Sequence, residues 1–189
     1  MDIPDVSLSA QHTASAAELR IRYTIANKSG GDIYVLDGLK LPGPNGQVIV
    51  STSEYALVKN EAGDAEVLVG IAPLPANKLV AVRTMPVATK LAAGSSQTRE
   101  LQPVPLPLTE RTPYITADEL QNAHVVTVQR LVLGVQFLRG SAPGLVATPL
   151  PFAPAHYDVK TPQTVQDARE VQVVLLPQAM PMRIVPGPR

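Results

Sequence analysis

The chain has no cysteine and no tryptophan, and it has only two phenylalanines and five tyrosines. Without cysteine it cannot form disulfides, thiolate zinc sites, iron–sulfur clusters or a cysteine nucleophile. The shortage of aromatic side chains also argues against sugar binding, which depends on stacking against aromatic faces. We therefore expect a core made mainly of Val, Leu, Ile and Ala.

Neither sign of charge predominates. The 189 residues carry 16 Lys and Arg against 16 Asp and Glu, a net charge of +0, and no three basic residues are consecutive. We expect no nucleic-acid partner, because binding through counterion release needs clustered basic side chains. We also expect no membrane span, because no apolar run reaches the ~18 residues that a spanning helix needs.

The sequence leaves the compartment open. Its first five residues, MDIPD, lack the positive start and apolar segment of a signal peptide. Absence of cysteine is compatible with a reducing or an oxidising compartment. A cytoplasmic location and, if a signal has been removed, a periplasmic or extracellular one are both compatible with this chain.

Proline and glycine are abundant and spread along the whole chain, with 19 and 12 residues respectively. Because proline is not tolerated inside helices, long helices have little room to form. Residues 18–26 instead alternate strictly, with Leu19, Ile21, Tyr23 and Ile25 on one face. This period of two predicts a strand with one buried face.

Further apolar segments predict more strands, joined by turn-rich links. Residues 27–32 predict either a hairpin or a connection that crosses between sheets. A change in parity predicts a bulge or a bend near Gln129. The other expected strands are 6–9, 33–36, 47–51, 55–59, 66–72, 78–84, 97–102, 124–139 and 171–175.

Two short helices are expected in the links between strands. Thr116 and Glu119 have the spacing of a capping box, which predicts a helix over 116–122. Thr161 followed by Pro162 predicts a second helix that extends to residue 168. Each is expected to have two turns at most.

These elements predict an all-β chain, an antiparallel β-sandwich of about seven to nine strands that forms one domain over residues 1–189. Residues 177–189 are expected to be a proline-rich tail. The order of segments 19–25, 91–101 and 131–137 resembles that of immunoglobulin-like domains. The Cys…Trp…Cys core of antibody domains is absent.

Pro103, Pro105 and Pro107 alternate within residues 102–108. In an extended segment they would remove every N–H group along one edge, which protects a sheet from further pairing. Pro-Leu-Pro also occurs at 73–75 and 149–151. The alternative is a polyproline ligand for an aromatic groove, and we favour edge protection.

No motif predicts catalysis. The chain lacks the nucleophile-elbow, phosphate-loop and zinc-helix patterns, so we expect no catalytic, cofactor-binding or metal-binding residue and no cofactor. The nearest approach to a site is His156 and Asp158, which would share one face of an extended loop segment. His12 and His124 have no comparable neighbour.

We therefore expect a non-catalytic binding or assembly module whose partner is another protein. Strands apolar on both faces predict the contact surface, made of Tyr55, Leu57, Val67, Val69 and Ile71. Two alternatives remain open. One is a structural homo-oligomer; the other is a hydrolase or carbohydrate-binding protein with a loop site near His156 and Asp158.

Overall fold

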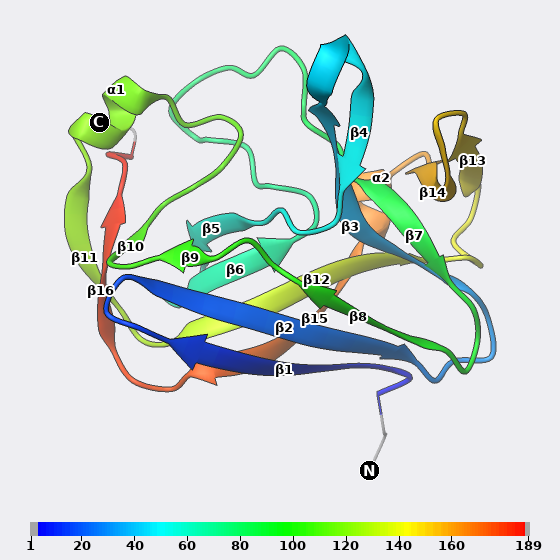
Figure 1. Ribbon diagram of the computed structural model, residues 1–189, viewed down its shortest axis with the longest axis horizontal. Helices are drawn as coiled ribbons and strands as arrows, with labels where there is room; N and C mark the ends of the chain where they lie inside the picture. The colour runs from blue at the N-terminus through cyan, green and yellow to red at the C-terminus, as the bar shows by residue number, and fades with distance from the viewer. Residues whose placement is uncertain (1–3, 188–189) are drawn as a thin grey trace.

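The computed structural model describes residues 4–187 (Figure 1). Strands make up 53% of the structure and helices 7%, which confirms the all-β prediction. The strands of this part of the chain are β1 (Val6–Ala14), β2 (Glu18–Asn27), β3 (Ile33–Pro42), β4 (Val48–Ser51), β5 (Ala56–Lys59), β6 (Ala65–Val69), β7 (Val87–Leu91), β8 (Ser96–Glu100), β9 (Val104–Pro105), β10 (Leu108–Thr109), β11 (His124–Val128), β12 (Leu131–Arg139), β13 (Val146–Leu150), β14 (Ala153–Lys160), β15 (Arg169–Leu176) and β16 (Met180–Ile184). The helices are η1 (Pro44–Gly46), α1 (Ala117–Gln121) and α2 (Thr164–Asp167).

The strands form three sheets. The first has the order β1–β2–β8, with β9 also paired to β2, and the second has the order β10–β16–β11. The largest has the order β13–β14–β7–β3–β12–β6–β5, with β15 also paired to β12 and β4 to β3. Most pairs are antiparallel as expected, but β6 pairs with β12 and β10 with β16 in parallel, which corrects the prediction of a wholly antiparallel structure.

One hydrophobic core joins the sheets. The inner face of β2 contributes Leu19, Ile21 and Ile25, and β12 contributes Leu133 and Val135 to the same cluster. In Figure 1, β1, β2 and β8 run across the front of β12 and β15. The alternation predicted for residues 18–26 is confirmed. Their apolar face is buried, and Arg20 and Arg22 on the opposite face are exposed to solvent.

Two connections cross between sheets. Residues 27–32 join β2 in the first sheet to β3 in the largest, so the crossing alternative is confirmed and the hairpin is wrong. The structure has a bend at Gln129, the second of the two predicted alternatives. The chain leaves β11 there and enters β12 in another sheet, so the change in parity marks a change of sheet.

The strand predicted over residues 78–84 is wrong. This stretch is irregular, and Leu79 and Val82 have exposed fractions of 102% and 82%. An apolar segment forms a strand only where a neighbouring strand accepts its hydrogen bonds, and residues 70–86 pair with none. The regular pairing begins only after Pro86, with β7.

The proline-rich segment 102–108 is not one edge strand as predicted. It is divided into β9, which pairs with β2, and β10, which pairs with β16. Val104 and Leu108 are both buried, so the segment ties two sheets together through its apolar residues. The prolines between them interrupt the pairing.

Three strands lie where the sequence predicted loops or tail. β13 and β14 form a hairpin over residues 146–160, and β16 lies inside the predicted tail with Met182 fully buried. Positions 188–189 of that tail lie outside the described residues. Helix α1 has the predicted capping box at Thr116, whereas α2 begins later than predicted, with Gln163 at its N-cap.

A buried carboxylate links the first sheet to the largest. Asp37 on β3 is 3% exposed and accepts hydrogen bonds from Thr89 Oγ1 at 2.7 Å, Gln97 Nε2 at 2.9 Å and Arg99 Nε at 3.0 Å. Thr89 lies on β7, and both Gln97 and Arg99 lie on β8. Because a buried charge is tolerated only with such partners, Asp37 fixes how β8 lies over β3 and β7.

We expect Asp37→Ala to reduce the free energy of unfolding by about 2–4 kcal/mol, since three partly buried donors lose their shared acceptor. The matched control is Asp158→Ala, which removes a solvent-exposed carboxylate paired with Lys40 at 2.9 Å. That change should cost less than about 1 kcal/mol. Urea unfolding of both variants measures the difference, and equal losses would contradict the role assigned to Asp37.

Candidate functional site

The five residues predicted as an open contact surface are buried. Tyr55, Leu57, Val67, Val69 and Ile71 are each no more than 6% exposed. Strand β6 lies between β5 and β12, and both of its faces are covered by other side chains. Val67 and Val69 face the main core, and Leu68 on the other face packs with Ala72 and Tyr114.

Two of these five residues nevertheless line a cavity of about 260 Å³, which we call the Tyr55 cavity. Strand β5 and the residue before it provide one wall. Pro105 and residues 109–112 provide another, and Ile115 together with Leu120 near the end of α1 provides the third. Its lining residues are Tyr55, Leu57, Pro105, Thr109, Glu110, Arg111, Thr112, Ile115 and Leu120.

Arg111 holds the wall of the Tyr55 cavity together. Its backbone exchanges two hydrogen bonds with Leu57, each 2.8 Å long, although the two residues belong to distant segments. Its guanidinium carbon lies 4.6 Å from the centre of the Tyr55 ring, and Nη2 lies 3.0 Å from a carboxylate oxygen of Glu54. The cavity therefore has apolar walls and a rim with one stacked, charge-paired arginine.

Tyr55 is fixed at its far end as well. Its hydroxyl donates a hydrogen bond to the carbonyl oxygen of Pro103 at 3.1 Å. Burial raises the pKa of the Tyr55 hydroxyl, and the nearby positive charge of Arg111 opposes that rise. The ring is therefore a neutral, rigid wall of the cavity at physiological pH.

The position of α1 depends on its N-terminus. Thr116 and Glu119 cap each other, and Glu119 also pairs with Lys78 at 2.7 Å. The Lys78 ammonium, followed by the backbone N–H of Thr116, lowers the pKa of Glu119 to about 2. The capping box was visible in the sequence, but its use in closing a cavity was not, because Lys78 and the β5 wall are far away along the chain.

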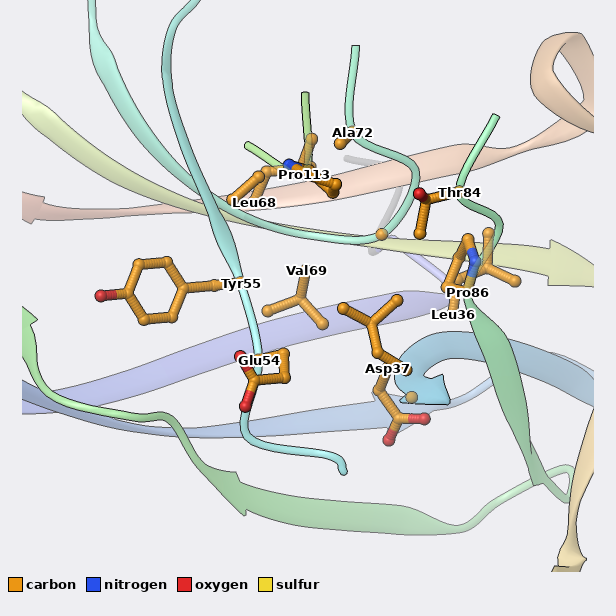
Figure 2. A pocket seen from close by; sticks show the side chains of 14 residues that line it. Leu36, Asp37, Glu54, Tyr55, Leu68, Val69, Ala72, Thr84, Pro86 and Pro113 are labelled. Atoms are coloured by element: carbon orange, nitrogen blue, oxygen red, sulfur yellow. The ribbon is translucent and has the colours of Figure 1, made fainter. Parts of the chain in front are cut away.

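A second, much smaller cavity lies between the ends of β3, β5 and β6 (Figure 2). Its volume is about 30 Å³, and Leu36, Val69, Pro86 and Pro113 are among its lining residues. Figure 2 shows the carboxylate of Asp37 directed away from Val69. This space is about the size of one water molecule, so it offers no room for a substrate.

The structure places His156 and Asp158 on strand β14 and not in a loop, which corrects that part of the prediction. His156 Nδ1 lies 3.4 Å from the hydroxyl of Thr89, and Asp158 pairs with Lys40 at 2.9 Å. The two side chains thus have separate partners. No group of three or more His, Cys, Asp or Glu residues within 4–187 is arranged to hold a metal ion.

A pair of carboxyl groups that sequence reasoning missed lies across the middle of the largest sheet. Glu66 on β6 and Glu170 on β15 both reach over Gly134 of β12, where a Cβ atom would collide with Glu66 Oε1 and lie 3.1 Å from Glu170 Oε1. Gln172 Nε2 donates to both, at 3.3 and 2.6 Å. The glycine inside an apolar strand was the only signal of this close approach.

Burial, followed by the neighbouring Glu170 carboxyl, raises the pKa of Glu66 to about 7. Asn60 and Gln172 donate hydrogen bonds to Glu66 and partly offset that rise. Ionising Glu66 would place a negative charge beside a second carboxyl group, which favours its protonated form. Near neutral pH the Glu66 carboxyl therefore titrates.

Comparisons with protein-family models, with curated proteins and with solved structures found no match to this chain. Within residues 4–187, no helix has the length and apolar character needed to span a lipid bilayer.

The titration of Glu66 predicts a pH-dependent stability. Its pKa is raised from 4.5 to about 7. The folded chain therefore keeps a proton on Glu66 that the unfolded chain releases as the pH rises through that interval. The contribution of Glu66 to stability therefore falls from about pH 4.5 to pH 7 and is constant above it. Glu66→Gln should remove this loss and make the variant more stable than the parent at pH 8 by about 1 kcal/mol, allowing for solvent screening.

Urea unfolding at pH 5 and pH 8 measures this difference. Glu61→Gln, in the exposed turn between β5 and β6, is the matched control and should leave the pH dependence of the parent unchanged. If Glu66→Gln and the parent lose stability in parallel between these pH values, the folded protein does not retain a proton at Glu66.

Proposed function

We propose that this chain is a non-catalytic β-module that binds another protein, and that the Tyr55 cavity takes one large apolar side chain of that partner. The observation that carries the proposal is the cavity itself, an apolar space of about 260 Å³ with an arginine at its rim. Anchor side chains in protein interfaces commonly fill such pockets.

The volume of the cavity favours a side chain over a free ligand. Pockets for drug-sized molecules are usually about 300–1,000 Å³ with several convergent polar groups. The Tyr55 cavity is smaller, and its two charged lining residues already have partners: Arg111 pairs with Glu54, and Glu110 accepts a hydrogen bond from the backbone N–H of Val185 at 2.8 Å. An engineered cavity of about 150 Å³ binds a benzene ring, so this space has room for a Leu, Met or Phe side chain.

The rival reading of a hydrolase or carbohydrate-binding site has less support. It rested on a free imidazole and carboxylate side by side, but His156 faces Thr89 and Asp158 faces Lys40. The immunoglobulin-like sandwich stays part of the proposal. Its support is the core shared by the first and largest sheets, while the parallel pairs of β6 and β10 depart from the antiparallel pattern of that fold.

Photo-crosslinking in the cells that produce the protein tests this function. Benzoylphenylalanine replaces Thr112, which lines the Tyr55 cavity, or Val146, an exposed apolar residue on β13. We expect a discrete adduct with a second protein from position 112 only. Leu120→Arg, which puts a charge in the cavity wall, should reduce that adduct at least about fivefold, because a partner side chain would no longer be desolvated there.

Val146→Arg is the matched control and should leave the adduct at position 112 unchanged. Circular dichroism shows whether each variant is folded. Equal adducts from positions 112 and 146 would refute the proposal, as would the same adduct at 112 in the Leu120→Arg variant. A discrete adduct at position 112 with only a second copy of the chain would also refute it, because the cavity would then hold no other protein.

A further inference from the structure

Strand β11 forms an outer edge of the sheet β10–β16–β11. Among the described residues it pairs only with β16, and in Figure 1 it lies at the left margin of the molecule. His124, Val125 and Thr127 are exposed, Val125 by 65%. This strand is distinct from the Tyr55 cavity, and the inference below does not rest on the proposed function.

The directions of the backbone groups on β11 follow from β16. The carbonyl oxygen of Arg183 accepts a hydrogen bond from Glu110 N at 2.8 Å, so Arg183 faces the β10 side and away from β11. Two residues earlier, Pro181 faces the same side. The residues opposite these two, Val125 and Thr127, therefore form non-hydrogen-bonded pairs, and their N–H and C=O groups point outward.

This open edge has defined ends. The N–H group of Ala123 donates to Leu120 O at 3.2 Å, and that of Gln129 donates to Gly63 O at 3.1 Å. Val125 and Thr127 between them retain two outward N–H groups and two outward C=O groups without a strand partner.

The side chains of β11 do nothing to prevent further pairing. Residues 124–128 read HVVTV and contain no proline, lysine or acidic residue, the usual protections of an edge. Some other edge strands do carry such protection. β9 and β13 contain Pro105 and Pro149, and β8 carries the charged Arg99 and Glu100.

We propose that two copies of the chain pair through β11, antiparallel and about a two-fold axis at Val126. In that register Val125 of each copy lies opposite Thr127 of the other, and every outward N–H meets an outward C=O. The sequence is thus complementary to itself at this edge, with Val125 packing beside the Thr127 methyl group. A net charge of +0 also leaves no overall repulsion between copies.

The absence of cysteine allows a clean test of both the contact and its register. Val125→Cys and Thr127→Cys are prepared as separate variants, mixed, and oxidised with glutathione disulfide. Opposed residues have Cα atoms about 5.5 Å apart, within disulfide reach, whereas 125 and its own copy are diagonal and farther apart. We expect the mixed disulfide at least about tenfold faster than either homodimer, because pairing raises the local thiol concentration.

The matched control is a mixture of Ser96→Cys and Thr98→Cys, two exposed positions with the same spacing on the charged edge strand β8. It should cross-link only at the background rate. If the β11 mixture reacts no faster than this control, the proposal is overturned. Faster reaction of Val125→Cys with itself would overturn the register and the two-fold axis at Val126.

Thr127→Pro tests the hydrogen bonds directly in the full chain. It removes an outward N–H group and none of the bonds to β16, so thermal unfolding should remain cooperative. Sedimentation velocity should show that the parent gains mass with concentration and that this variant remains at 20.1 kDa. Equal self-association of the two folded proteins, or a parent that is monomeric throughout, would contradict the proposal.

Discussion

The buried carboxylate of Asp37 fixes the arrangement on which the rest of the molecule depends. It lies where the pairing of β3 with β7 shifts register, and it accepts hydrogen bonds from one residue of β7 and two of β8. Apolar packing alone lets two sheets slide past each other, because it has little directionality. A charge with three fixed donors allows only one position, which defines how β8 crosses the larger sheet.

The Tyr55 cavity follows from that position. The chain leaving β8 hydrogen-bonds through Gln102 N to Ser53 O at 2.8 Å, and Pro103 O then receives the Tyr55 hydroxyl. The same segment continues through β9 and β10 to Arg111, which returns to Leu57. One continuous segment thus holds the residues just before β5 and Leu57 within it. The space between that segment and α1 remains open.

Sequence patterns predicted the elements whose stabilising contacts are local or periodic. The alternation of Leu19 to Ile25 and the capping box at Thr116 belong to this class, and both are present. The strand expected around Leu79 has an equally apolar pattern but no neighbouring strand to accept it. Conversely, β14 lacks an apolar pattern, so the sequence did not predict it. It forms a strand because its backbone pairs with β7 and β13.

The candidate site shows the same division. Tyr55 and Leu57 were identified as apolar residues of a contact surface. The sequence held no information that β6, which carries Val67 and Val69, would lie between β5 and β12 with both of its faces covered. The Glu66–Glu170 pair joins residues 104 positions apart over Gly134, so only the sheet order brings it together. Long-range pairing decides which apolar residues are core and which line a cavity.

The most direct measurement of the central claim is methyl NMR of the chain titrated with toluene, an analogue of a phenylalanine side chain. We predict saturable shifts for the methyl groups of Leu57, Ile115 and Leu120, which line the Tyr55 cavity. Shifts confined to the exposed methyl groups of Leu79 and Val82, or no saturable shift in any of the five residues, would contradict the claim that this cavity accepts an apolar side chain.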